Sequence, residues 1–229
     1  MMQLVVIRPE PGCSATLAAA RELGLEAHGF PLFRIISRSC EAPPASKLDA
    51  LLIGSANALR CAGDDLARYA GRPAYVVGEA TASAAEAAGF TIAASGKGGL
   101  QDVVGAITHK RLLRLTGEEF VRLEIPPGIM LTERIVYASH TRPVPAELAE
   151  MLAFPAVVML HSAAAARHFD AECERLHLDR SQLTLAVIGP RVAEAAGLGW
   201  RMIVAAPEPS DHALLALAER LCQTAASRR

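Results

Sequence analysis

The sequence predicts an α/β fold in which two similar parallel-sheet (flavodoxin/Rossmann-like) domains are joined by a two-stranded β linker, with one domain discontinuous. Three observations predict this class. Residues 49–107 and 155–221 follow the same order of apolar runs and helices, and a repeat of about 110 residues suits a duplicated domain rather than a solenoid. Apolar runs alternate with helical stretches, as in parallel sheets. The second copy lacks a first strand and helix, which residues 1 to about 30 supply.

Each element has its own local signal. Short apolar runs bounded by turn residues predict buried strands, and Gly24 is a typical helix stop. The long alternating run at 130–140 reads as one strand that could leave one domain and enter the other. In chain order we expect a strand at 4–7, a helix at 13–23, an extended run at 30–36, a strand at 111–115 followed by a turn at Thr116-Gly117, the long strand at 130–140 and a helix at 146–152.

Counting these elements gives the domain boundaries. The predicted organisation is a discontinuous α/β domain at 1–34 and 141–229, an inserted α/β domain at 39–134, and linker strands at 35–38 and 135–140. Two connections side by side usually permit relative domain motion, and ligands favour the cleft between such domains.

Composition excludes several classes of partner. The formal net charge is −1, with 23 basic and 24 acidic side chains, so bulk electrostatics recruits neither nucleic acid nor a membrane surface. The five cysteines are scattered without Cys-x-x-Cys spacing, which favours a reducing compartment and disfavours a zinc site. No export signal or bilayer-spanning run is visible, so we expect a cytoplasmic protein.

Four polar or glycine positions follow predicted strands. In a parallel sheet the strand ends face helix N-termini, whose free amides suit anions. Ser55, Gly78, Ser162 and Gly189 all occupy such ends, and Asn57 lies two residues after Ser55. Any one of them could simply cap a helix, but the symmetry of the set across two domains favours a ligand that carries several carboxylates.

Motifs for cofactors and covalent chemistry are absent from the sequence. The Val77-Gly78 stretch has one glycine where a dinucleotide fingerprint needs three, and neither a phosphate loop nor a Gly-x-Ser-x-Gly elbow occurs. No histidines form a metal-ligand pair; His161 precedes Ser162 at a strand end and could face the cleft, although a packed or surface role is commoner. We therefore expect no metal and no cofactor.

Three further residues are candidates for chemistry. Tyr137 falls on the proposed linker, where a phenol could donate a proton or a hydrogen bond to a substrate; packing in a strand is its ordinary alternative. Arg8, after the first strand, and Arg191, after Gly189, are candidates for pairing with ligand carboxylates, with simple solvent exposure as the alternative.

Over nearly its whole length the chain resembles the uroporphyrinogen-III synthase family. The order and spacing of six short motifs carry this resemblance: Ile7-Arg8-Pro9, Ser55-Ala-Asn57-Ala, Val77-Gly78-Glu-Ala-Thr81-Ala, Ile135-Val-Tyr137, the strand that ends at Ser162, and Ile188-Gly189-Pro190. The resemblance implies two α/β lobes on a two-stranded linker. It also implies a cofactor-free, monomeric enzyme that cyclises the linear tetrapyrrole hydroxymethylbilane, with inversion of ring D and loss of water.

The resemblance also implies roles for residues. Tyr137 matches the family's linker tyrosine and would assist departure of the hydroxyl group, and Thr81 matches the threonine after the Val-Gly turn. Arg191-Val192 stands where the family often has Thr-Thr, so Arg191 would take over anion binding there, and Thr116-Gly117-Glu118 replaces a frequent Arg-Gly. The positions that would bind acetate and propionate groups are Ser55, Asn57, Ser162 and the amides near Gly78 and Gly189.

Two other function classes stay open from sequence. A non-catalytic two-lobed anion-binding or sensor protein would share the hinge and the helix ends, but would bind without turnover. A nucleotide-dependent α/β transferase is disfavoured by the missing phosphate loop.

Overall fold

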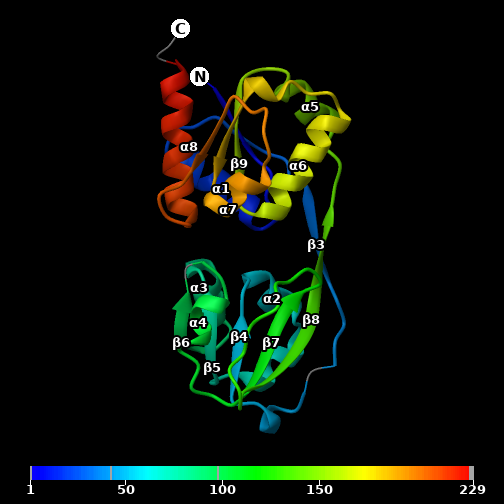
Figure 1. The fold of residues 1–229 in the computed structure, drawn as a ribbon, viewed down its shortest axis with the longest axis vertical. Helices are drawn as coiled ribbons and strands as arrows, with labels where there is room; N and C mark the ends of the chain where they lie inside the picture. The colour runs from blue at the N-terminus through cyan, green and yellow to red at the C-terminus, as the bar shows by residue number, and fades with distance from the viewer. Residues whose placement is uncertain (1, 42, 97, 227–229) are drawn as a thin grey trace. The chain divides into compact units, whose positions relative to one another are not determined.

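The computed structural model describes residues 2–41, 43–96 and 98–226 (Figure 1). The chain divides into two compact units: unit 1 comprises Met1–Arg34 with Thr141–Arg229, and unit 2 comprises Ile35–His140. Each unit is built on one largely parallel sheet. The predicted fold class is thereby confirmed, including the discontinuity of one of the two units.

Unit 1 carries a five-stranded sheet in the order β11-β10-β9-β1-β2, and every neighbouring pair is parallel. The chain lays down β1, adds β2 on one side, and later returns to the other side of β1 with β9. The strand order therefore reverses between β1 and β9. The elements are β1 (Gln3–Val6), α1 (Gly12–Glu22), β2 (Ala27–Gly29), α5 (Ala146–Leu152), β9 (Ala156–Leu160), α6 (Ala163–Arg175), η3 (Arg180–Gln182), β10 (Leu183–Val187), α7 (Pro190–Ala195), β11 (Met202–Ala205) and α8 (Asp211–Ala226).

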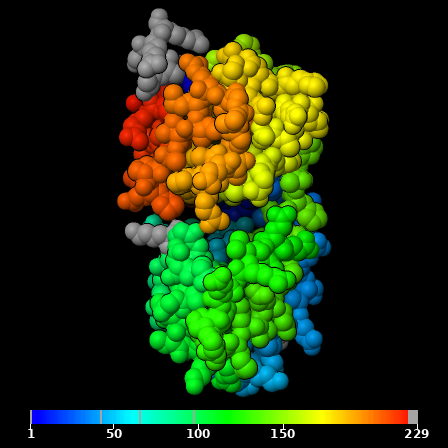
Figure 2. Space-filling model, in the orientation of Figure 1, coloured from blue at the N-terminus to red at the C-terminus, as the bar shows by residue number. Residues whose placement is uncertain are grey.

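The sheet of unit 1 is buried on both faces. Successive side chains of a strand point to opposite faces, so Leu4 packs into the cluster of α1 and α8, whereas Val5 packs into the cluster of α5, α6 and α7. All residues of β9 are buried, which explains why this run is continuously apolar rather than alternating. In Figure 2 the face of unit 1 that is in view is formed by α6 (yellow), by the orange segment that contains α7 and β11, and by α8 (red) at the left.

Unit 2 carries a six-stranded sheet in the order β3-β8-β7-β4-β5-β6. Here the strand order reverses between β4 and β7. One face packs on α2 and α3 and the other on α4. The elements are β3 (Phe33–Ser37), η1 (Ala45–Lys47), β4 (Ala50–Ile53), α2 (Ala56–Cys61), η2 (Asp64–Tyr69), β5 (Pro73–Val77), α3 (Glu79–Ala87), β6 (Thr91–Gly96), α4 (Gln101–Val104), β7 (Arg111–Gly117) and β8 (Met130–Thr141).

Strands β3 and β8 carry the chain between the units and lie side by side (Figure 1). The Arg38 amide donates to the Val136 carbonyl at 2.8 Å, and the Arg142 amide donates to the Leu32 carbonyl at 2.8 Å, so the two strands run in opposite directions. The predicted single long strand at 130–140 is confirmed as β8. The predicted turn at Thr116-Gly117 is wrong, because both residues belong to β7 and pair with β8.

Two features bear on the class of protein. No helix within the described ranges is both long enough and apolar enough to cross a membrane. The short edge strand β2 was not predicted, because its three residues are only half-buried and carry no periodic pattern.

Candidate functional site

The first candidate site is the carboxyl edge of the unit 1 sheet, where its strands end. Arg8 follows β1, Ser162 follows β9 and Gly189 follows β10. Because these strands are neighbours, the three residues lie along one edge. Arg8 and Ser162 flank the reversal of strand order, the place where ligands bind in open doubly wound sheets.

Arg8 is anchored at this edge. Its Nη1 donates to Asp211 Oδ2 at 2.7 Å and lies 3.4 Å from Thr16 Oγ1. The guanidinium also covers Gly12 in the first turn of α1, where an added Cβ would lie 2.5 Å from Arg8 Nε. Glycine at position 12 therefore lets the cation lie against the helix, while Asp211 in the first turn of α8 balances its charge.

His161 lies beside this pair and is buried, with 8% of its side chain exposed. Its Nε2 lies 3.8 Å from Asp211 Oδ1, and neither ring nitrogen has a hydrogen-bond partner within the described part of the chain. Burial, reinforced by the nearby Arg8 cation and opposed by Asp211, lowers the pKa of His161 to about 3. The imidazole is therefore neutral at physiological pH.

Ser162 and Gly189 begin helices at the same edge. Ser162 Oγ accepts a hydrogen bond from the Ala165 amide at 3.1 Å and so caps α6. Gly189 has extended backbone at the N-cap of α7, and Pro190 follows at the first helical position. Arg191 is exposed on the first turn of α7. The structure thus gathers Arg8, Ser162, Gly189 and Arg191 on one edge of unit 1.

The second candidate site is the carboxyl edge of the unit 2 sheet. Ser55 follows β4 and its Oγ accepts from the Asn57 amide at 3.2 Å, so it caps α2. Asn57 Oδ1 in turn accepts from Arg60 Nη2 at 2.7 Å. Gly78 caps α3 with φ of +76°, a left-handed conformation that favours glycine. Thr81 is buried in the first turn of the same helix.

Tyr137 reaches this edge through a β-bulge in β8. Thr116 pairs with Ile135 but Gly117 pairs with Tyr137, so Val136 is an extra residue. Val136 and Tyr137 consequently both pack against the core formed with α2 and α3, although adjacent strand residues ordinarily face opposite ways. The bulge therefore re-aims the tyrosine ring.

Gly117 provides the space into which that ring turns. A Cβ at Gly117 would lie 2.8 Å from Cε2 and Cζ of Tyr137 and 3.1 Å from its hydroxyl oxygen. The backbone is held as well, because the Tyr137 carbonyl accepts from the Glu118 amide at 3.0 Å. The phenol thus lies over the end of β7, next to β4, the strand that Ser55 follows.

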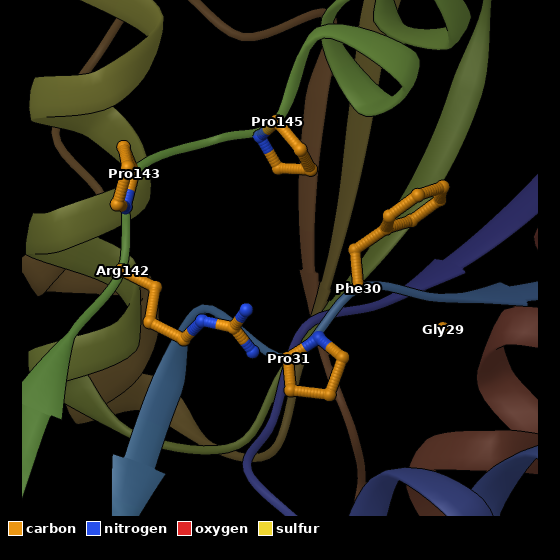
Figure 3. A pocket seen from close by; sticks show the side chains of 6 residues that line it. All are labelled: Gly29, Phe30, Pro31, Arg142, Pro143 and Pro145. Atoms are coloured by element: carbon orange, nitrogen blue, oxygen red, sulfur yellow. The ribbon is translucent and has the colours of Figure 1, made fainter.

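A small pocket lies at the carboxyl end of β2 in unit 1 (Figure 3). Its volume is about 160 Å³. The Arg142 side chain extends toward Pro31, on the opposite wall (Figure 3). The lining residues are Gly29, Phe30, Pro31, Arg142, Pro143 and Pro145.

Thiols and metal ligands offer little chemistry in the described residues. No group of three or more His, Cys, Asp or Glu side chains there could hold a metal ion. Burial raises the pKa of Cys13 to about 11, of Cys173 to about 12 and of Cys222 to about 11. These thiols stay protonated at neutral pH and are therefore weak nucleophiles.

Two residues of these edges were missed by sequence reasoning. Asp211 gave no signal, because its partner Arg8 is far away in the chain. Gly117 was interpreted as part of a turn, although a glycine directly after an apolar strand is also typical of a close approach by a neighbouring side chain.

These features define the class of protein. Each unit is a doubly wound α/β sheet whose carboxyl edge carries polar side chains and helix N-termini, and two strands connect the units. This is a two-domain α/β architecture, with Arg8 and Arg191 at the edge of the unit 1 sheet and Tyr137 at the edge of the unit 2 sheet.

The chain belongs to the uroporphyrinogen-III synthase family, because the model of that family, described as uroporphyrinogen-III synthase HemD, matches residues 14–216. It is similar to a crystal structure of uroporphyrinogen-III synthetase from Helicobacter pylori, with a TM-score of 0.63, 19% identity, and coverage of 96% of this chain and 100% of the other. A mutant uroporphyrinogen III synthase from the extremely thermophilic bacterium Thermus thermophilus gives a TM-score of 0.56, 15% identity and coverage of 97% and 100%. At these identities the likeness shows the fold. Comparison with curated proteins gives no significant match.

Proposed function

We propose that this chain is a uroporphyrinogen-III synthase, which cyclises hydroxymethylbilane with inversion of ring D and loss of water. The observation that carries the proposal is family membership across both units, since the matched residues 14–216 include β4, β8 and β9. The positions of Tyr137, Arg8 and the capping serines at strand ends support it.

In the proposed reaction the chain's residues position the substrate and handle one proton. Tyr137 transfers its phenolic proton to the substrate hydroxyl as the carbon–oxygen bond breaks, so that the hydroxyl leaves as water and an azafulvene remains. The substituted carbon of the last ring, ring D, attacks the azafulvene carbon that lost the hydroxyl and gives a spiro intermediate. Fragmentation and reclosure of this intermediate then invert ring D. On reclosure the last ring loses one proton, which returns the Tyr137 phenolate to the phenol and balances the proton taken up by the leaving hydroxyl.

Carboxylate binding holds the flexible substrate in the conformation that reacts. Arg8 and Arg191 supply cations in unit 1, and the helix N-termini at Ser162 and Gly189 supply amides. In unit 2 the proposed contacts come from Ser55, Asn57, Gly78 and Thr81. Holding the reacting rings together supplies much of the rate without a strong acid-base pair.

The test mixes the protein with freshly generated hydroxymethylbilane and separates the product isomers. We expect type III product above the spontaneous type I product. Tyr137→Phe should lower kcat by about 100-fold or more, the usual contribution of a positioned proton donor. Tyr75→Phe is the matched control, because it also removes a tyrosine hydroxyl but at the other end of the sheet. The Tyr75 hydroxyl lies 2.8 Å from His109 Nδ1, in the segment before β7 begins, and so away from the carboxyl edge.

The outcomes separate the open alternatives. Type I product alone would refute the synthase and favour the two-lobed anion-binding protein. Normal turnover in well-folded Tyr137→Phe would leave the synthase proposal standing but would show that Tyr137 takes no part in the mechanism.

A further inference from the structure

Three side chains meet where the strand order of unit 1 reverses. Arg8 follows β1, His161 follows β9 and Asp211 begins α8. Asp211 is the link between them: one carboxylate oxygen lies 2.7 Å from Arg8 Nη1 and the other lies 3.8 Å from His161 Nε2. The three groups form a cation, a neutral imidazole and a carboxylate at the place where doubly wound sheets bind ligands.

His161 lowers the stability of the fold at this position. Its ring nitrogens are buried and lack hydrogen-bond partners within the described residues, and a buried polar group without a partner destabilises the fold. A neutral imidazole carries one N–H donor, and Nε2 faces the Asp211 carboxylate. Positions where a chain departs from the rules of stability are commonly functional, so this unpartnered donor points to a ligand that would accept its hydrogen bond.

The Asp211 carboxylate shows which ligand would fit. It occupies the space next to both Arg8 and His161, and 52% of its side chain is exposed, against 22% for Arg8. An ion pair with a solvent-exposed partner contributes little to stability, so a carboxylate of a ligand can readily replace Asp211 beside Arg8. In addition, the N-terminus of α8 stabilises a free Asp211 carboxylate, because Asp211 belongs to its first turn.

We propose that Arg8 and His161 form a carboxylate-binding subsite that Asp211 occupies in the free protein and that a ligand carboxylate enters by displacing Asp211. Arg8 supplies the charge and His161 Nε2–H donates the hydrogen bond that selects for a carboxylate oxygen. Under the proposed function, on which the identity of the ligand rests, the entering group is an acetate or propionate side chain of the acidic tetrapyrrole.

The decisive variant removes the competing charge. Asp211→Asn keeps the size of the side chain, and we expect it to bind uroporphyrin III, a stable octacarboxylate tetrapyrrole, with a Kd about two- to fivefold lower than that of the wild type. Glu147→Gln is the matched control, because Glu147 is an exposed acidic residue in the first turn of α5. The measurement is equilibrium titration of porphyrin fluorescence, with coproporphyrin III as the comparison that has half the carboxylates.

The opposite result has a clear meaning. If Asp211 only orients Arg8, Asp211→Asn will raise the Kd, and that outcome overturns the proposal. An equal decrease in Asp211→Asn and Glu147→Gln also overturns it, because a general gain of positive charge then explains the effect.

A second variant tests the imidazole. His161→Phe should raise the Kd about fivefold, as loss of one hydrogen bond to the ligand does, while the midpoint of thermal unfolding stays the same or rises because a buried unpaired polar group is gone. A lower midpoint with unchanged Kd would assign His161 a structural role and defeat this part. Porphyrin binding is read separately from isomer formation, so failure of the subsite and failure of the synthase proposal are distinguishable.

Discussion

Gly117→Ala is the sharpest perturbation that the structure offers, since it adds one methyl group beneath the ring of Tyr137. The new Cβ would lie 2.8 Å from two ring carbons, whereas carbon atoms pack at about 3.5–4.0 Å. The ring must therefore move by roughly 0.7–1.2 Å. The neighbouring backbone resists a shift of the strand, because the carbonyls of Val136 and Tyr137 accept hydrogen bonds from the Arg38 and Glu118 amides.

The expected effect is on turnover. A misplacement of about 1 Å in a catalytic group can lower the rate about 100-fold, which corresponds to about 2.7 kcal/mol in the barrier. The backbone itself accepts alanine, because Gly117 is not among the glycines with positive φ. Stability should fall by no more than about 1–3 kcal/mol, the usual cost of overpacking.

The assay compares four proteins by steady-state formation of type III product: wild type, Gly117→Ala, Tyr137→Phe and the double variant. Because Gly117 acts on turnover only through the position of the phenol, adding Gly117→Ala to Tyr137→Phe should change kcat little. Gly105→Ala is the matched control, since a Cβ there meets nothing within 4 Å. An equal loss in both backgrounds, or full activity in Gly117→Ala, would refute the positioning argument.

Three further predictions concern stability and capping. The folded protein holds His161 in its neutral form, whereas the unfolded chain protonates it below its ordinary pKa of about 6.5, so the free energy of unfolding is highest above pH 6.5 and falls as the pH is lowered toward 3. From pH 7 to 5 the free energy of unfolding should fall by about 2 kcal/mol in the wild type but not in His161→Phe. Parallel pH profiles of the two proteins would contradict this. Ser55→Ala and Ser162→Ala should each cost about 1 kcal/mol of stability as lost caps and also raise KM for hydroxymethylbilane; an unchanged KM would restrict both serines to capping. Phe169→Ala removes a fully buried ring stacked on Trp200, with centroids 5.6 Å apart, and should cost about 3–5 kcal/mol; the single tryptophan reports unfolding of unit 1 by fluorescence, and an unshifted denaturation midpoint would show that Phe169 does not support that core.

The sequence predicted the fold and the helix-capping positions because both depend on local patterns. Buried parallel strands are apolar runs, so the ends of β4 and β9 were visible, and with them Ser55 and Ser162. The contact between Arg8 and Asp211 could not be predicted, because it joins residues about 200 positions apart and, although Arg8 was visible after the first strand, Asp211 carries no local signature. The bulge at Val136 was equally invisible, since it is defined by pairing with β7 rather than by its own residues.

The two edges divide the work that the proposed reaction requires. At the unit 1 edge Arg8 and Arg191 are the candidate carboxylate-binding cations, whereas at the unit 2 edge Arg60 is hydrogen-bonded to Asn57 Oδ1 and Tyr137 packs against the core formed with α2 and α3. This separation has a physical advantage, because a cation beside a phenol favours its ionised form and an ionised phenol has no proton to donate. Arg38 directly follows β3, and its ion pair with Glu118, at 2.8 Å, neutralises the cation at that end of the strand. Under the proposed function, carboxylate binding by the arginines and proton donation by Tyr137 are therefore compatible, because they are assigned to different sheets.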